Sequence, residues 1–412
     1  MGPLLRNRAL LVVGASETVS NLGNWVTALA VYALIIFRGG GGPAESSAIL
    51  LASLVPALVA SPFAGWLCDR FDRKWLMVAS ELLSGLAVVG LIFADRLALI
   101  YGLLAAQSAF GVVLMPARQA AVPQLVEREQ LTRANALLQQ LAGAVKIGGP
   151  MLGGLLLTVL EPHQAMVLDV VSFLLSAWLL SRLPSLPPGE SPATHQVRPQ
   201  PAAGSGFLDL LRRVPLLPFL LLASFLSVAL IMSYDVLGTI YTRDVLRGDE
   251  SFYGLQVGLI GGGMVAATLF LMVRRGPGHP LRDLAAGLLL LACIPASLAL
   301  GAGVQPGVAR WLTAGGCLLG GLGDGLLVVQ SATLLQLISP AALLGRLGGM
   351  FQSTVTAGRL VAVLLVPLLV PQLITLGHFF ALAGLALAIL ALTTAVARWR
   401  GMGGPVAAPK EA

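Results

Sequence analysis

Twelve apolar stretches follow one another along the chain and are separated by short polar segments. Most exceed the roughly 20 residues that an α-helix needs to cross the hydrocarbon core of a bilayer. The pattern therefore predicts an all-α membrane protein with twelve transmembrane helices. Their approximate ranges are 9–37, 46–68, 75–94, 97–118, 134–160, 164–182, 215–242, 252–273, 281–302, 308–330, 346–370 and 372–398.

Composition leads to the same class. Of the 412 residues, 57% are hydrophobic and only 11% are charged, and the mean hydropathy is +0.86. A water-soluble protein of this size cannot bury so much apolar surface, whereas a bundle in lipid does not need to. The first stretch is too long, and too polar in its middle, for a cleavable signal, so we interpret it as the first span. The three cysteines show no paired spacing, which predicts neither a disulfide framework nor a metal site.

One segment between the sixth and seventh stretches differs from the rest. Residues 183–214 contain six prolines and no apolar periodicity, so we expect a flexible tether there, with Phe207–Arg213 as a short amphipathic helix on the membrane surface. The predicted organisation is an N-terminal six-helix half (1–182), a cytoplasmic linker (183–214) and a C-terminal six-helix half with a short cytoplasmic tail (215–412).

The basic residues predict the orientation. Most of the 26 lysines and arginines, Arg118 among them, fall in the segments on the side that holds both termini and the linker. The positive-inside rule places that side in the cytoplasm. Because the bases are spread over many loops, nucleic-acid binding is a poor interpretation.

The turn after the second stretch, Gly65–Lys74, reads GWLCDRFDRK and holds two acids and three bases. It resembles the pattern G-x-L-a-D-r-x-G-r-k that follows the second helix in transporters of the major facilitator superfamily, although Asp72 stands where the pattern has glycine. The resemblance implies a gating loop made of Gly65, Asp69, Arg70, Arg73 and Lys74.

That resemblance also implies partners for the gating loop. Asp69 would lie near the N-terminus of the eleventh helix, at about Gly345–Arg346, where the helix dipole favours a carboxylate. Arg70 and Arg73 would form ion pairs across the cytoplasmic face.

The fifth stretch carries Gly149, Pro150, Gly153 and Gly154 in the order G-P-x-x-G-G, which resembles the signature of exporters in the same superfamily. Small residues there also let helices approach closely. Further segments resemble the drug-, macrolide- and siderophore-exporting branch: 20–25, 116–119, 133–135, 168–173 and 207–213. The two halves show a weak internal repeat, with Gln124-Leu125 matching Gln336-Leu337, as expected for parallel repeats. The second half has no good copy of the acidic loop, because Arg274-Arg275-Gly276 has bases only.

Ionisable residues inside spans are costly and are functional candidates by default. They are Glu17, Glu81, Lys146, Asp169, Asp235, Asp324 and Arg359. In the fold that the resemblance implies, helices 1, 4, 7 and 10 line a central cavity. This makes Glu17, Asp235 and Asp324 the main cavity acids, with Asn21, Asn24, Trp25 and Tyr234 as candidate substrate contacts. Glu17, Asn21 and Asn24 form one polar stripe at helical spacing.

Structural alternatives stay open for these residues. Glu81 could pair with loop arginines, and Asp169 and Asp235 could be satisfied by solvent or Arg243 near the outer helix ends. Lys146 or Arg359 could neutralise Glu17 or Asp324, and the aromatic candidates could serve packing alone. We favour Asp324 as the proton carrier, because its glycine surroundings leave it facing the cavity, and take Glu17 as the next choice.

No catalytic arrangement, nucleotide loop or metal-ligand cluster is recognisable, so we expect neither an enzyme nor a cofactor. The sequence predicts a monomeric secondary transporter of the bacterial inner membrane that exports small amphipathic molecules, such as drugs, macrolides or siderophores, by proton antiport and alternating access. Its expected partners are that substrate, protons and membrane lipids. A lipid or lysolipid translocator and a non-transporting receptor on the same fold are the alternatives.

Overall fold

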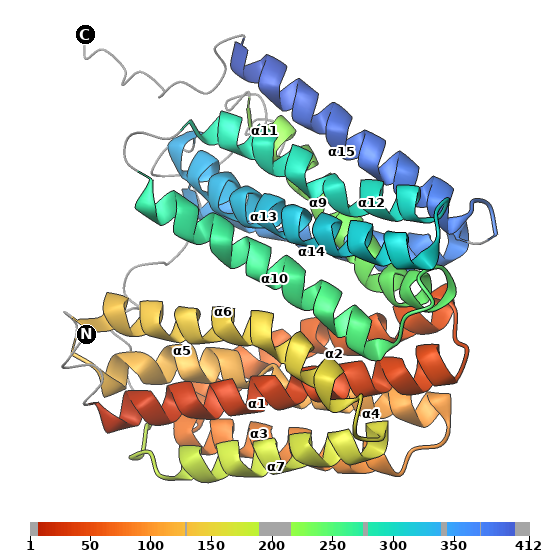
Figure 1. Ribbon diagram of the computed structural model, residues 1–412. Coiled ribbons are helices and arrows are strands. Elements are labelled where there is room, and N and C mark those ends of the chain that lie inside the picture. Colours follow the sequence, from red (N-terminus) through yellow and green to blue (C-terminus); the bar gives the residue numbers. More distant parts are fainter. Residues whose placement is uncertain are drawn as a thin grey trace, which may run out of the picture. The chain divides into compact units, whose positions relative to one another are not determined.

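The computed structural model describes residues 7–127, 130–188, 216–274, 279–338, 344–370 and 372–399, and the regular elements in these ranges are helices (Figure 1). Eleven of the described helical segments are long and apolar enough to cross a membrane. The remaining predicted span, the fifth, corresponds to the 26-residue helix α6. The prediction of an all-α membrane protein is confirmed.

The first predicted half contains these elements: α1 (Arg8–Tyr32), the π-helix η2 (Ala33–Arg38), α2 (Pro43–Arg70), α3 (Arg73–Ile92), α4 (Leu97–Gly111), α5 (Leu114–Leu125), α6 (Leu131–Leu156) and α7 (Pro162–Ser181). The second contains α9 (Leu217–Asp244), α10 (Glu250–Val273), α11 (Pro280–Leu291), α12 (Cys293–Gly301), α13 (Pro306–Ile338), α14 (Leu344–Leu369) and α15 (Leu376–Trp399). The predicted fourth span is the pair α4 and α5, and the ninth is the pair α11 and α12.

The helices group into two compact units. The first comprises Met1–Gln200 with Asp249–Gly258, and the second comprises Pro201–Gly248 with Leu259–Ala412. In the first unit, α1 packs against α6 and α7, α3 packs against α7, and α2 packs against α4 (Figure 1). In the second, α13 and α15 each pack against α11 and α12, while α14 packs against α9.

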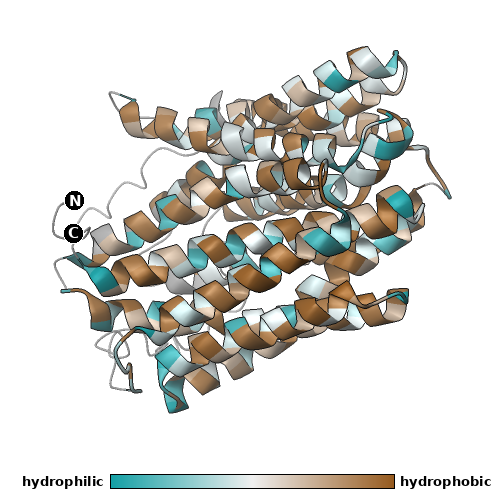
Figure 2. Cartoon of the chain, turned by 60° about the horizontal axis from the view of Figure 1, so that its bottom comes forward, coloured by the Kyte–Doolittle hydropathy of each residue, from teal (hydrophilic) through white to brown (hydrophobic). Residues whose placement is uncertain are grey.

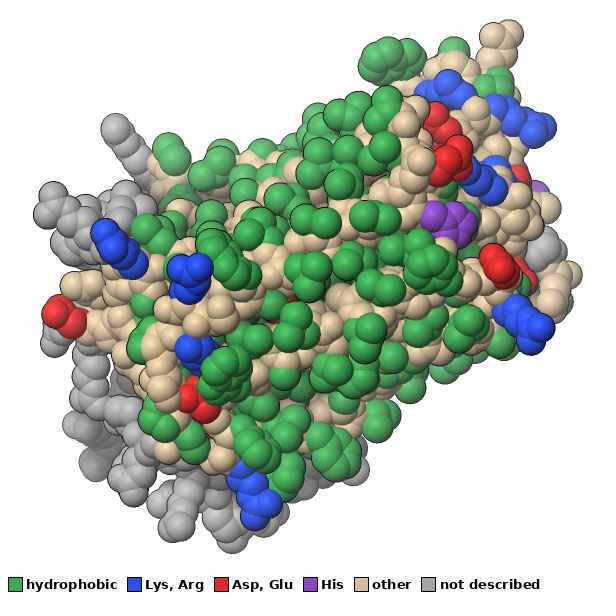
Figure 3. All heavy atoms as spheres, turned by 90° about the horizontal axis from the view of Figure 1, so that it is seen from below, with side chains coloured by type: hydrophobic (Ala, Val, Ile, Leu, Met, Phe, Trp, Pro, Cys, Tyr) green, Lys and Arg blue, Asp and Glu red, His purple; other side chains and the backbone are tan. Residues whose placement is uncertain are grey.

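Apolar side chains lie outward along the helices. Hydrophobic and hydrophilic positions are interspersed along each helix in Figure 2, and on the face shown in Figure 3 hydrophobic side chains cover the middle while charged ones lie toward the ends. Phe63, Leu86 and Trp178 are each at least half exposed. Lipid tolerates such surfaces, because apolar side chains lose nothing by contacting acyl chains.

The start of the predicted linker is packed into the first unit. Leu183 and Leu186 are buried in a hydrophobic cluster with Met77 and Leu180, so these residues continue the fold beyond α7. Residues 189–215, including the predicted surface helix Phe207–Arg213, lie outside the described residues.

Candidate transport site

A largely buried ion pair joins α1 to α5. The Arg118 guanidinium donates to both carboxylate oxygens of Glu17, and the two side chains are only 12% and 18% exposed. Arg118, which the sequence places at the end of an apolar stretch on the cytoplasmic side, lies within α5, and this helix continues to Leu125. Removing two charges from water is expensive, so each charge depends on the other.

The positive charge beside Glu17 comes from Arg118 on α5. The side chains of Lys146 on α6 and Arg359 on α14 are both exposed. The signal available in the sequence was the segment Pro116–Gln119, which we had noted only for its resemblance to exporters.

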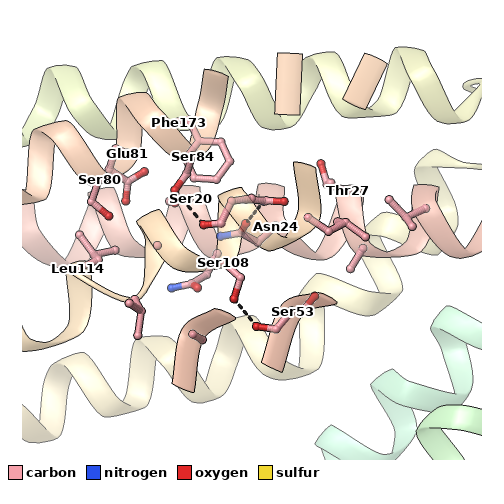
Figure 4. Close-up of a pocket in the computed structure, with 18 of the residues that line it drawn as sticks. Ser20, Asn24, Thr27, Ser53, Ser80, Glu81, Ser84, Ser108, Leu114 and Phe173 are labelled. Atoms are coloured by element: carbon pink, nitrogen blue, oxygen red, sulfur yellow. Dashed lines mark hydrogen bonds between the residues drawn. The ribbon is translucent and has the colours of Figure 1, made fainter. Parts of the chain in front are cut away.

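The first unit contains a partly open cavity of about 390 Å³ next to this region (Figure 4). Its lining comes from α1, α2, α3, α4 and α7, from Leu114 at the start of α5, and from Val112 between α4 and α5. Two of the predicted substrate contacts, Asn21 and Asn24, line it, and the Asn24 amide oxygen accepts a hydrogen bond of 3.0 Å from the Gln107 amide. Trp25 does not belong to this lining.

Polar side chains that the sequence did not single out complete the lining. They are Ser20, Thr27, Ser53, Ser80, Ser84, Gln107 and Ser108. Periodicity could not select them, because serine and threonine are frequent in transmembrane helices as ordinary packing residues.

Glu81 on α3 is the one ionisable residue in this lining. Its side chain is 2% exposed, and within the described residues its Oε2 atom has no hydrogen-bond partner. The hydroxyls of Ser20 and Ser176 lie beside the carboxyl. Pairing with a loop arginine, which we had considered, does not occur among the described residues; Figure 4 shows Glu81 with Ser80, Ser84 and Phe173 at the cavity.

Asp169 on α7 is buried completely, yet its carboxylate is well satisfied. Thr27 donates to one oxygen at 2.5 Å, and Ser172 donates to the other at 3.0 Å. A Cβ atom on Gly23 would lie 2.2 Å from the Asp169 carboxylate, so glycine is needed there for α1 to approach α7. Hydroxyl groups of the protein, and not solvent, therefore satisfy this carboxylate.

In the gating loop, the side chains of Asp72 and Arg73 face the linker. Asp72 caps α3 by accepting from the Lys74 backbone N–H at 2.9 Å, and it also accepts from the Ser185 hydroxyl and the Leu186 N–H. Arg73 is buried and its guanidinium donates to the Pro187 carbonyl. The acid that replaces the pattern's glycine therefore ties this loop to the linker.

The other predicted gating residues make no contact with the linker in the described part of the chain. Asp69 and Arg70 are exposed, and Arg70 lies over the Trp66 ring at 4.9 Å, while Lys74 lies 5.0 Å from the Trp75 ring. A Cβ atom on Gly65 would meet nothing within 4 Å. The predicted approach of Asp69 to Gly345–Arg346 stays a prediction.

The glycines of the G-P-x-x-G-G segment make close helix contacts. A Cβ on Gly149 would lie 2.3 Å from the Trp25 ring, and one on Gly153 would lie 3.2 Å from the Trp25 carbonyl oxygen. A Cβ on Gly154 would lie 3.1 Å from the Ser251 backbone. Trp25 thus packs against α6, which is the packing alternative considered above.

In the second unit, Asp235 and Asp324 are half-buried. Tyr234 is 3% exposed, and its hydroxyl lies 3.7 Å from the Cys317 sulfur. The glycines on either side of Asp324 pack closely against the backbones of α11 and α10. A Cβ on Gly323 would lie 2.4 Å from the Leu291 nitrogen, and one on Gly325 would lie 2.6 Å from the Met264 carbonyl oxygen.

Arg274 forms an ion pair with an acidic residue on α11, although its own loop segment contains no acid. Its guanidinium lies 2.6 Å from the carboxylate of Asp283, which is buried in the first turn of α11 and also contacts Arg282. An acid at a helix N-terminus is further stabilised by the helix dipole. Among the described residues, no group of three or more His, Cys, Asp or Glu could hold a metal ion.

Long apolar helices, two compact units and carboxylates held inside the spans define the class: a multi-pass membrane protein. Residues 15–363 match the model of the Major Facilitator Superfamily, and the chain belongs to that family of transporters.

Relatives and solved structures agree with this assignment. The chain is 29% identical to the uncharacterized MFS-type transporter YfiS of Bacillus subtilis over 86% of this chain and 85% of that one. It is 27% identical to the enterobactin exporter EntS of Escherichia coli over 71% and 69%, and 29% identical to the multidrug efflux pump Tap of Mycolicibacterium fortuitum over 43% and 46%. A crystal structure of a peptide transporter in complex with alafosfalin superposes with a TM-score of 0.74 at 15% identity, covering 96% and 94%.

Proposed function

We propose that this transporter exports small amphipathic molecules across the bacterial cytoplasmic membrane by proton antiport and alternating access, acting as a monomer. Its relatives include a multidrug efflux pump and a siderophore exporter, which supports the direction of transport. The observation that carries the proposal is a set of carboxylates retained inside apolar helices, with Glu17 paired to Arg118 and Glu81 facing a cavity.

Proton coupling follows from the cost of those charges. A carboxylate in a membrane interior is rare, and it either serves transport or is paired with a group that neutralises its charge. If a substrate and a proton compete for one carboxylate, binding of either displaces the other, and the proton gradient then drives the substrate outward. Glu17, Asp235 and Asp324 stay candidates for this role, with Asp324 preferred. The gating loop around Asp69 would couple the exchange to the change of access.

The experiment is a susceptibility panel in an efflux-deficient bacterial host that expresses the chain. The panel should include macrolides, lipophilic cationic dyes and siderophore-dependent growth, each with and without a proton uncoupler. Lower susceptibility that the uncoupler abolishes supports the proposal. Unchanged susceptibility together with an altered phospholipid composition would support a lipid translocator instead.

A further inference from the structure

We propose that the cavity of the first unit binds the protonated amine of an amphipathic substrate, with the Glu81 carboxylate as the hydrogen-bond acceptor for the ammonium group. The inference rests on the proposed transport function and specifies a substrate class for it. Neither membership of the family nor the similarity to its relatives assigns a ligand to this cavity.

The charge of the lining favours a cation. Glu81 is the single ionisable side chain among the lining residues, so no lysine, arginine or histidine of the lining competes for its carboxylate. Arg118 is engaged with Glu17. A buried acceptor without a partner costs free energy, which a donor on a ligand recovers.

The contrast with Asp169 shows that burial alone does not explain Glu81. Both carboxylates are buried in the same unit, but each Asp169 oxygen accepts from a hydroxyl of the protein. The Glu81 Oε2 atom has no such donor within the described part of the chain. The hydroxyls of Ser20 and Ser176 lie beside the Glu81 carboxyl, but its Oε2 atom still lacks a donor, which a ligand in the cavity can supply.

The shape and polarity of the cavity favour an amphipath over a bare ion. A volume of about 390 Å³ accommodates a small organic molecule. Serine hydroxyls at positions 20, 80 and 84 lie on the lining with Glu81 and can accept further ammonium hydrogens. Val31, Ile49 and Leu104 supply apolar contacts for the rest of the ligand.

The test uses the full-length chain purified in detergent and three probes with one naphthylethyl body. They are the primary amine, its trimethylammonium analogue and the alcohol, and binding is followed by naphthalene fluorescence. The amine should bind most tightly, because the quaternary cation has no N–H donor and the alcohol has no charge. Glu81→Gln should weaken the amine about tenfold or more and leave the alcohol within about twofold. Asp95→Asn, which removes one exposed carboxylate, is the matched control and should change neither.

A pH series adds a second measurement. An ammonium that binds the Glu81 carboxylate must displace any proton there, so amine affinity should fall as the pH is lowered, and this dependence should vanish in Glu81→Gln. Two other carboxyl groups lie close enough to act on the charge of Glu81. They are Asp169 and Glu17, and Glu17 is paired with Arg118. The alcohol, scanned over the same pH range, reports any effect of their titration on the cavity.

A carbodiimide protection experiment on the unmodified chain makes the test independent of variant folding. At saturation the trimethylammonium analogue, which cannot couple to an activated carboxyl group, should protect Glu81 from modification by dicyclohexylcarbodiimide, as located by peptide mass spectrometry, and the alcohol should protect it less. Equal amine affinity in Glu81→Gln and the unmodified chain, or no protection by a saturating trimethylammonium analogue, would overturn the inference. If uncoupler-sensitive export of another substrate persists in that case, the proposed function stands without it. Glu81-dependent amine binding by a chain that transports nothing would support the cavity assignment and contradict the proposed export function.

Discussion

The Asp72 carboxylate accepts a hydrogen bond of 2.5 Å from the hydroxyl of Ser185, 113 residues further along the chain. Further bonds from the Leu186 and Lys74 backbone N–H groups fix the same carboxylate. Partial burial works in the opposite direction, but these hydrogen bonds prevail and lower the pKa of Asp72 below its ordinary value of 3.8. The loop between α2 and α3 and the start of the linker therefore form one structure.

Replacing Asp72 with alanine should release the linker start. The helix cap and the two contacts are lost together, so we expect a destabilisation of about 1–2 kcal/mol, measured by thermal unfolding in detergent, and faster proteolysis near Pro187. Because the folded pKa is depressed, this contribution is complete above about pH 4 and is lost as the pH falls through the lowered value. The stability difference between the unmodified chain and Asp72→Ala should therefore shrink in acid; a difference that is constant down to pH 2 would contradict the assignment.

The Glu17–Arg118 pair should behave as a unit. Glu17→Gln leaves a buried guanidinium without its counter-charge, and the expected cost is about 3 kcal/mol or a severe loss of folded protein. The double variant Glu17→Gln with Arg118→Met removes both charges and should recover most of that stability in a thermal-shift assay. Additive losses in the double variant would show that the two side chains do not interact.

In the gating loop, Asp69→Asn should abolish transport while expression and thermal stability stay near those of the unmodified chain, because Asp69 is exposed and its loss leaves no buried charge. Uptake into inside-out vesicles measures the rate. Asp95→Asn is the control for loss of an exposed acid. A loop that serves only as a topology signal would tolerate Asp69→Asn at full rate.

For coupling, Asp324→Asn should eliminate gradient-driven efflux and retain substrate binding and downhill exchange. The asparagine keeps the shape of the side chain but cannot release a proton. Proteoliposomes with and without an imposed pH gradient separate the two activities. Should the variant still concentrate substrate with the original pH dependence, Glu17 becomes the next residue to test.

Gly149 and its neighbour Gly148 offer a matched pair on α6. A Cβ at Gly149 would lie 2.3 Å from the Trp25 ring, whereas one at Gly148 would meet nothing within 4 Å. Gly149→Ala should therefore lower the unfolding temperature or the yield, and Gly148→Ala should be neutral or slightly stabilising through helix propensity. Equal effects of the two substitutions would show that α1 and α6 do not pack as described.

Apolar periodicity was sufficient to predict the helices, because each span must satisfy its own backbone hydrogen bonds in lipid. It did not indicate the full length of α5, because hydropathy marks where a span becomes polar, and the helix continues beyond Arg118 to Leu125. The roles of Glu81 and Asp169 depend on which hydroxyls neighbouring helices bring to each carboxylate. Those contacts join residues far apart in the sequence, such as Thr27 with Asp169, and a single sequence does not specify them.

The glycines of α13 also restrict how this protein can diverge. A methyl group at Gly321 would lie 2.1 Å from the Ile260 carbonyl oxygen, and one at Gly323 would enter the backbone of α11. A substitution at either glycine should therefore destabilise the packing of α13, whatever it does to substrate specificity. The serines and alanines around the cavity of the first unit face open volume instead. Descendants of this chain that acquire new substrates are expected to accumulate their replacements there, while α13 keeps its glycines.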